Sequence, residues 1–272
     1  MTGIEKQKLL LQMLDKFDPA SSLWRTIEVA WVMDVLSELK VCGLTLDLGC
    51  GEGNISGMAF KSSKVSLVGL DNWQELLFEA KLSGVYKSLV LSDARFMPFK
   101  DSKFDNVFSN SVIEHIEDID KVAEEVSRVL KPGGLFIFTV PSDKFGDYLF
   151  FYRLFKGLGL KRIADWYKNK RIALLAHYNL HDKDGWAKKL DGLGLKIIES
   201  RFYLSKGVLS LWDLIAAFGF LLKKLNLRGD LLKVSEQIQK KIFYAFFRRL
   251  ITEKSLNNDS SAGLLAIARK LN

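Results

Sequence analysis

One short segment, Asp47 to Asn54, limits the folds open to this chain more than any other. Apolar residues precede it, glycines occupy positions 49, 51 and 53, and a helical pattern follows. Glycine has no Cβ atom, so the backbone can turn with positive φ and a ligand can lie directly against it. The first amides of the following helix have no intrahelical partners. A strand, a glycine turn and a helix start therefore predict a nucleotide-binding corner.

The spacing of these glycines separates classes of nucleotide-binding protein. It is G-x-G-x-G, whereas dinucleotide enzymes carry G-x-G-x-x-G, and Asp47 has no place in that fingerprint. The run D-L-G-C-G-E-G resembles the first motif of class I S-adenosylmethionine (SAM) dependent methyltransferases, within them the methyltransferase type 11 and ubiquinone-biosynthesis methyltransferase group. In that family the turn holds the methionine part of SAM. The resemblance implies SAM as cofactor and Asp47, Gly49 and Gly51 as residues that bind it. The alternative is a glycine turn that only packs a helix on a sheet.

Two aspartates that follow buried strands extend the predicted nucleoside site. Val65 to Asp71 reads as a second strand, and Asp71 lies 20 residues beyond Gly51. A carboxylate there can accept hydrogen bonds from both ribose hydroxyls. Leu89 to Ala94 reads as a third strand that ends at Asp93. It resembles the family motif in which an aspartate accepts a hydrogen bond from the adenine amino group.

The next motifs come in the order of the same family. Met97 to Phe99 fits its apolar wall near the adenine, and Phe104 to Asn110 reads as a fourth strand. The resemblance implies Asn110 as a further cofactor-binding residue. Val129 to Gly134 combines Pro and Gly, which stop a helix, and leads into a fifth strand, Leu135 to Val140.

His115 is the predicted catalytic residue. It follows the fourth strand, and in such sheets the carboxyl ends of the strands face the substrate crevice. Its neutral pKa range suits removal of a proton from an acceptor. His177, Tyr178 and His181 are further candidates near the acceptor pocket, and the alternative is that these histidines are structural. Three histidines and two cysteines are too few and too scattered for a metal site, so none is expected.

The alternation of strand and helix predicts an α/β fold with a doubly wound, seven-stranded, mostly parallel sheet and an antiparallel last strand. Helical insertions are expected after strand five and between strands six and seven. The expected divisions are 1–40 as N-terminal helices that cap the cofactor cleft, 41–142 as the SAM-binding core, 143–176 as a basic aromatic insertion, 177–205 as core with strand six, 206–258 as a basic helical insertion, and 259–272 as strand seven. Packing on the sheet edge is the alternative for the N-terminal helices.

The two insertions hold the positive charge of the chain. Residues 143–176 carry a net charge of +5 and residues 206–254 carry +6, which leaves −3 for the rest of a chain whose total is +8. The apolar run 208–222 has only 15 residues and includes Asp213, so it is short for a membrane-spanning helix, which needs about 20 apolar residues. It suits a helix in the bilayer interface with basic residues at the head groups. A helical cap over the active site is the alternative.

These features predict a SAM-dependent methyltransferase that acts on a small-molecule or lipid-linked, amphiphilic acceptor. An anionic membrane surface is a candidate partner, whereas nucleic acid is disfavoured because the aromatics stand in dense runs with Leu and Ile and no binding module is present. Cys42 and Cys50 are expected as reduced thiols, which favours the cytoplasm, with peripheral attachment to the inner face of a membrane. The alternative function is a non-catalytic module of the same fold that docks through its basic helices. A nicotinamide-dependent dehydrogenase would need the longer glycine spacing.

Overall fold

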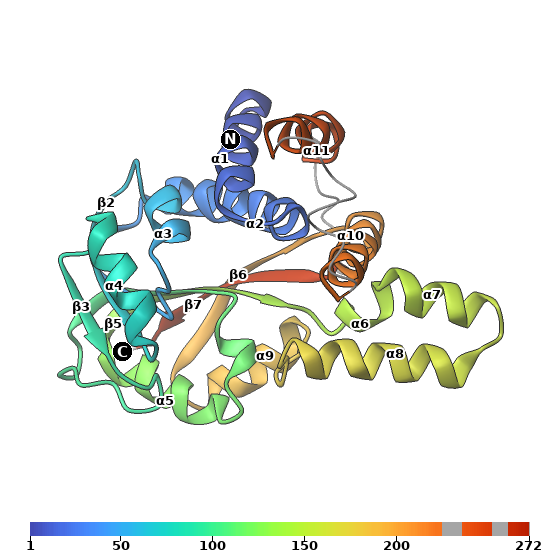
Figure 1. The fold of residues 1–272 in the computed structure, drawn as a ribbon. Coiled ribbons are helices and arrows are strands. Elements are labelled where there is room, and N and C mark those ends of the chain that lie inside the picture. Colours follow the sequence, from blue (N-terminus) through green and yellow to red (C-terminus); the bar gives the residue numbers. More distant parts are fainter. Residues whose placement is uncertain (225–235, 252–260, 272) are drawn as a thin grey trace. The chain divides into compact units, whose positions relative to one another are not determined.

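The computed structural model describes residues 1–224, 236–251 and 261–271 (Figure 1). Parts of the predicted insertion 206–258, namely 225–235 and 252–258, lie outside the described residues. By the contacts among its residues the chain divides into two compact units. One unit, the sheet unit, comprises 32–143, 172–201 and 263–272, and the other, the helical unit, comprises 1–31, 144–171 and 202–262.

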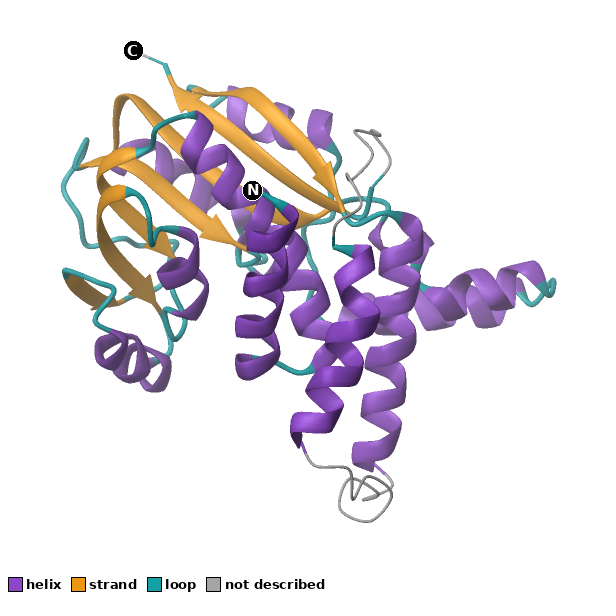
Figure 2. Ribbon diagram, turned by 90° about the horizontal axis from the view of Figure 1, so that it is seen from above, coloured by secondary structure: helices purple, strands orange, loops and turns teal. Residues whose placement is uncertain are grey.

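The sheet has seven strands in the order β3-β2-β1-β4-β5-β7-β6, drawn as one twisted layer of arrows in Figure 2. The strands are β1 (Cys42–Leu48), β2 (Lys64–Asp71), β3 (Ser88–Leu91), β4 (Phe104–Asn110), β5 (Leu130–Pro141), β6 (Leu195–Tyr203) and β7 (Gly263–Lys270). The pairs among β1 to β5 are parallel, and β7 runs antiparallel to β5. The predicted fold class is confirmed.

The central strands are buried toward their carboxyl ends, where the site lies. The last four residues of β1 and the last five of β2 are buried, as expected of parallel strands covered on both faces. Asp47 of β1 stands opposite Gly69 of β2 on one side and Phe108 of β4 on the other. The register therefore gathers the carboxyl ends of three strands at one edge of the sheet.

The predicted end of the third strand is wrong. The strand stops at Leu91 instead of Asp93. Beyond it the Asp93 carboxylate accepts a hydrogen bond from the Arg95 amide (2.8 Å), and the Phe96 amide donates to the Asp93 carbonyl (2.9 Å). An aspartate side chain that bonds the backbone two residues later favours a turn over an extended strand.

Four α-helices belong wholly to the sheet unit, namely α3 (Asn54–Ala59), α4 (Gln74–Ser83), α5 (Ile119–Val129) and α9 (Lys183–Asp191), together with the short 3-10 helix η1 (Ile113–His115). α5 ends at Val129, as the sequence predicts, but β5 begins at once with Leu130, so the predicted strand start at Leu135 is wrong. The pairing with β4 passes from Leu130 to Leu135, so Pro132 to Gly134 lie in an irregular part of the strand. α9 begins after Asp182, whose side chain accepts a hydrogen bond from the Gly185 amide (2.8 Å) and caps the helix.

The helical unit gathers α1 (Gly3–Lys16), most of α2 (Pro19–Glu38), α6 (Phe145–Tyr148), α7 (Phe150–Gly157), most of α8 (Lys161–Leu174), α10 (Lys206–Lys224) and α11 (Glu236–Leu250). Its core includes the rings of Trp24, Phe145 and Trp212, whose centroids lie 5.6 to 6.0 Å apart. Among the described helices, none is both long enough and apolar enough to span a bilayer.

The acidic residue in the apolar run of α10 points into this unit. Asp213 is fully buried and accepts hydrogen bonds from the Tyr167 hydroxyl (2.7 Å) and the Phe151 amide (3.3 Å). The Arg171 guanidinium lies 3.2 Å from the same carboxylate. Burial raises the pKa of Asp213, whereas these partners lower it. One face of α10 is therefore an internal packing surface, while Leu214, Phe218 and Leu221 are exposed.

Candidate functional site

A pocket of about 600 Å³ opens at the carboxyl ends of β1, β2 and β4 and beside the turn after β3. Its volume lies within the range of about 300–1,000 Å³ that is typical of small-molecule sites. The lining residues come from the sheet unit alone. They include Gly49, Gly51, Asp71, Trp73, Leu76, Ser92, Asp93, Arg95, Ser111, Val112, His115, Glu117 and Tyr178.

The glycine turn shapes the floor of this pocket. Gly49 and Gly51 have φ of +74° and +51°, which side chains rarely adopt. A Cβ atom at Gly49 would stand 2.4 Å from the Val112 side chain, whereas one at Gly51 would meet nothing within 4 Å. Gly49 is therefore required for close packing inside the protein. Gly51 leaves space that a ligand can fill, which fits the methionine part of SAM.

Asp71 is held rigidly beside the turn. The residue is 7 % exposed, and its carboxylate accepts hydrogen bonds from the Gly51 amide (2.8 Å) and the Trp73 amide (3.0 Å). A carboxylate has about four acceptor positions, so two remain for other donors. Such a fixed acceptor suits the two hydroxyls of a ribose. The adjacent Trp73 is 62 % exposed and offers an indole face at the pocket rim.

Asp93 also lines the pocket, in an ion pair that the sequence does not predict. Arg95 donates to both of its carboxylate oxygens, with the shortest contact at 2.6 Å. These hydrogen bonds hold the pKa of Asp93 below its ordinary value. The sequence shows that Arg95 lies only two residues beyond Asp93, but it does not show that the two side chains point toward each other. An adenine amino group would share the Asp93 carboxylate with this guanidinium.

Asp47 and Asn110 do not line the pocket. The Asp47 carboxylate lies behind the glycine turn and accepts hydrogen bonds from the Ser56 and Tyr86 hydroxyls, both at 2.6 Å. Burial raises the pKa of Asp47 to about 6, despite those two bonds. Asp47 thus ties β1 to α3 and to the segment before β3. Asn110 is the last residue of β4.

The neighbouring thiol of Cys50 is buried and Cys42 is exposed, and neither forms a disulfide. Burial raises the pKa of the Cys50 thiol, and the nearby carboxylate of Asp47 raises it further. The thiol is therefore protonated at neutral pH and acts as a small apolar side chain in the turn.

His115 stands at the end of η1 and faces the pocket. Its Nδ1 lies 3.2 Å from the Ala176 carbonyl oxygen. Since a carbonyl only accepts, we assign the proton to Nδ1 in this contact. Its Nε2 lies 3.6 Å from the buried Glu114 carboxylate.

The loop of residues 176–179 holds the His115 loop in place. The Tyr178 amide donates to the Glu114 carbonyl (2.8 Å), and the Asn179 side chain donates to the carbonyls of Ile113 (3.2 Å) and Ile116 (2.7 Å). Asn179 was not among the predicted site residues, because its partners lie far away in sequence. Tyr178 itself lines the pocket, as its position in the sequence suggested.

The other two histidines have different surroundings. The His177 ring lies beside that of His115, with centroids 5.2 Å apart. Donor atoms of Glu114, His115 and His177 lie within 4.8 Å of one another, so this group has the chemistry to hold a metal ion. The expected absence of a metal therefore stays a prediction. His181 packs on Trp186 and lines a separate pocket, and burial lowers its pKa.

Comparison with known proteins finds a methyltransferase family model and several relatives. A family model described as a methyltransferase domain, type 11, matches residues 46–138. Dimethylglycine N-methyltransferase of Parasynechococcus marenigrum is 35 % identical over 119 residues, which cover 40 % of this chain and 41 % of that protein. Human arginine-hydroxylase NDUFAF5 is 33 % identical over 94 residues, which cover 35 % of this chain and 27 % of that protein. The chain thus spans less than half the length of these two relatives.

Two further matches cover more of both chains. An Encephalitozoon cuniculi protein described as a methyltransferase is 30 % identical over 160 residues, or 57 % of this chain and 71 % of that protein. The crystal structure described as a sarcosine dimethylglycine methyltransferase from Galdieria sulphuraria has a TM-score of 0.59 and 17 % identity. That alignment covers 95 % of this chain and 90 % of that one, and it shows the likeness of the fold.

Proposed function

Because the chain belongs to the type 11 family of class I SAM-dependent methyltransferases, we propose that it transfers a methyl group from SAM to a small-molecule or amphiphilic acceptor. The observation that carries the proposal is a single pocket that brings together Gly51, Asp71, Asp93 and His115. These residues lie up to 64 positions apart in sequence, on four different segments.

The residues of the pocket suit the parts of SAM. We assign the methionine part to the open space at Gly51, the ribose to Asp71 and the adenine to Asp93, with the Trp73 indole available to cover the purine. Bound SAM would supply a methyl group already activated by the sulfonium. The protein then has to orient the acceptor and exclude water, and proximity can provide much of the rate enhancement.

We assign His115 the role of general base for an acceptor that carries a proton. Its Nδ1–H faces the Ala176 carbonyl, so Nε2 is the nitrogen available to receive that proton. Glu114 would stabilise the resulting imidazolium from 3.6 Å. Asn179 and the Tyr178 amide act as positioning groups, because they fix the backbone on which His115 stands.

The acceptor class is argued from two observations. A relative is named for dimethylglycine, a small molecule. The basic, aromatic insertions of this chain favour an amphiphilic, anionic acceptor reached at a membrane surface. A peripheral protein at the inner, cytoplasmic face of a membrane could meet both a small-molecule and an amphiphilic acceptor.

Two measurements test the proposal. Calorimetric titration with S-adenosylhomocysteine should show binding at one site, and labelled-methyl transfer from SAM to host extracts should give a labelled product. Binding without transfer in any extract would favour the non-catalytic module, or another reaction such as the hydroxylation for which one relative is named. Absence of binding would refute the cofactor assignment. Tight binding of NADH would instead point to a dehydrogenase.

A further inference from the structure

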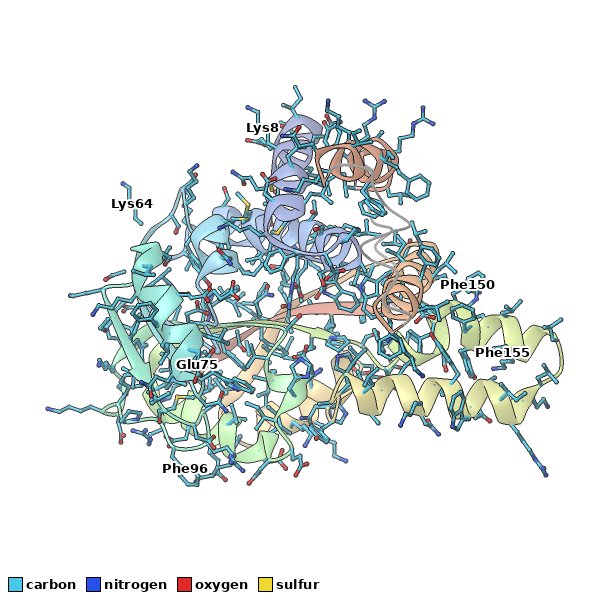
Figure 3. The ribbon with its side chains drawn as sticks, in the orientation of Figure 1. Lys8, Lys64, Glu75, Phe96, Phe150 and Phe155 are labelled. Atoms are coloured by element: carbon cyan, nitrogen blue, oxygen red, sulfur yellow. The ribbon has the colours of Figure 1, made fainter. Side chains whose placement is uncertain are left out.

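The helices α7 and α8 of the helical unit expose several large apolar side chains, and we call residues 150–170 of this pair the hairpin. The two helices lie side by side in Figure 1 and are joined by Leu158, Gly159 and Leu160. Between them, the Tyr167 ring lies 5.5 Å from that of Phe151 and 6.3 Å from that of Phe155, which is labelled in Figure 3. These contacts and the buried Ala164 supply the interior of the hairpin.

Further large apolar side chains of the hairpin are exposed. The exposed set is Leu154 (42 %), Leu158 (64 %), Leu160 (44 %), Ile163 (44 %) and Trp166 (64 %). Two of them, Leu158 and Leu160, form the turn itself, whereas an ordinary surface loop carries mainly polar residues there. Five exposed large apolar side chains within residues 154–166 favour an interaction site.

The charge around this apolar surface indicates what covers it. Residues 150–170 carry six basic side chains and one acidic one. Lys168 is paired with Asp147, but Lys161, Arg162 and Lys170 have no carboxylate within ion-pair distance among the described residues. A second copy of this chain would bring two surfaces of +5 together and repel. An anionic surface would instead attract the basic side chains of the hairpin.

We infer that the hairpin is the membrane-docking element, with its apolar turn and Trp166 in the head-group region of an anionic bilayer. Lys161, Arg162 and Lys170 then meet lipid phosphates, and the alkyl stems of these side chains can lie along the apolar layer. Tryptophan suits this depth because it has an apolar ring and a polar N–H group. The inference rests on the proposed function, because docking would give the protein access to an amphiphilic acceptor.

The test is co-sedimentation of the full chain with vesicles made of equal parts phosphatidylcholine and phosphatidylserine. The double variant Lys161→Gln/Arg162→Gln should lower the partition coefficient roughly 30-fold, at about fivefold per cation. Its matched control is Lys61→Gln/Lys64→Gln, in the sheet unit, where Lys64 points into solvent (Figure 3). The control changes the net charge equally and should bind nearly as the parent does. Equal losses in the two variants would overturn the inference.

A second pair of variants tests whether the apolar side chains of the hairpin enter the bilayer. Leu158→Ser/Leu160→Ser should lower the partition coefficient at least about tenfold, because two leucines no longer leave water. Leu82→Ser, at a leucine of α4 that is 73 % exposed, is the control and should not change it. If the parent instead forms a dimer that Leu158→Ser/Leu160→Ser dissociates, as measured by sedimentation, a second copy covers the hairpin and the inference fails.

Calorimetry with S-adenosylhomocysteine keeps the two proposals apart. The hairpin variants should bind it as the parent does, which shows that they are folded. A parent that binds S-adenosylhomocysteine but no vesicles would overturn the docking inference and leave the function intact. Vesicle binding without S-adenosylhomocysteine binding would overturn the proposed function and leave the docking inference intact.

Discussion

Replacement of Asp71 by alanine tests the nucleoside site most directly. Asp71 is buried, and its carboxylate accepts two backbone hydrogen bonds, from Gly51 and Trp73. Hydrogen bonds to a charged group contribute about 1.5–3 kcal/mol each, so Asp71→Ala should lower the free energy of unfolding by roughly 3 kcal/mol. The variant should also bind S-adenosylhomocysteine more weakly. Weak binding alone, however, would not separate a lost ligand contact from a loosened turn.

A ligand that lacks one ribose hydroxyl makes this separation. The unaltered protein should prefer S-adenosylhomocysteine over its 2′-deoxy analogue by about tenfold or more, since one charged hydrogen bond is worth at least about 1.5 kcal/mol. In Asp71→Ala the two ligands should bind equally, because the acceptor is gone. Four calorimetric titrations complete this cycle and give the coupling between carboxylate and hydroxyl directly.

Asp105 provides the matched control. Like Asp71, it accepts a backbone hydrogen bond, from the Leu44 amide (2.8 Å). It also accepts one from the Lys131 ammonium (2.6 Å), but it does not line the pocket. Asp105→Ala should lower stability and keep the preference for the ribose hydroxyl. If Asp71→Ala keeps that preference too, Asp71 only organises the turn and the ribose assignment is refuted.

Four other predictions follow from the same geometry. Gly51→Ala places a methyl group in the open space of the turn and should weaken S-adenosylhomocysteine binding at least about tenfold in calorimetry, while strain at φ +51° lowers stability by roughly 1 kcal/mol. His115→Gln should lower kcat about 10²–10⁴-fold with ligand affinity unchanged; loss of affinity instead would make it a binding residue. The pKa of Asp47 is about 6 in the folded protein and 3.8 ordinarily, so the folded state binds this proton more tightly. The protonated carboxyl therefore contributes about 3 kcal/mol to the free energy of unfolding below pH 4, and this contribution is lost as pH rises through 6. Denaturation of Asp47→Asn across that window should show a flatter slope, and an unchanged slope would contradict the assignment. Methyl transfer should survive dialysis against EDTA, whereas loss that zinc or magnesium restores would show that Glu114, His115 and His177 hold a metal.

The sequence predicts the sheet well because buried parallel strands are short apolar runs that end in recognisable residues. Asp71 illustrates this, since the chain places it at the end of β2 and the fold brings it to the glycine turn. Asp47 illustrates the limit. Its position in a motif says nothing of its partners, Ser56 and Tyr86, the second of which lies 39 residues away.

Side-chain direction accounts for most of what sequence cannot provide. Asp213 interrupts an apolar run, and only the three-dimensional arrangement shows that it meets Tyr167 and Arg171 inside the helical unit. Arg95 could have pointed to solvent but pairs with Asp93. His181 is close in sequence to Tyr178, yet the two residues line different pockets.

The late return of the chain to the sheet has a consequence for folding. A fragment that stops at Val140 would contain all the recognisable motifs, yet it would lack β7, which pairs with β5 from Leu135 to Pro141. It would also lack Asn179, which anchors the carbonyls of Ile113 and Ile116. Such a fragment has an open strand edge, a ready template for aggregation. During synthesis, therefore, the segment around His115 gains these anchors only after Asn179 has emerged, and the edge of β5 is covered only after β7 has followed.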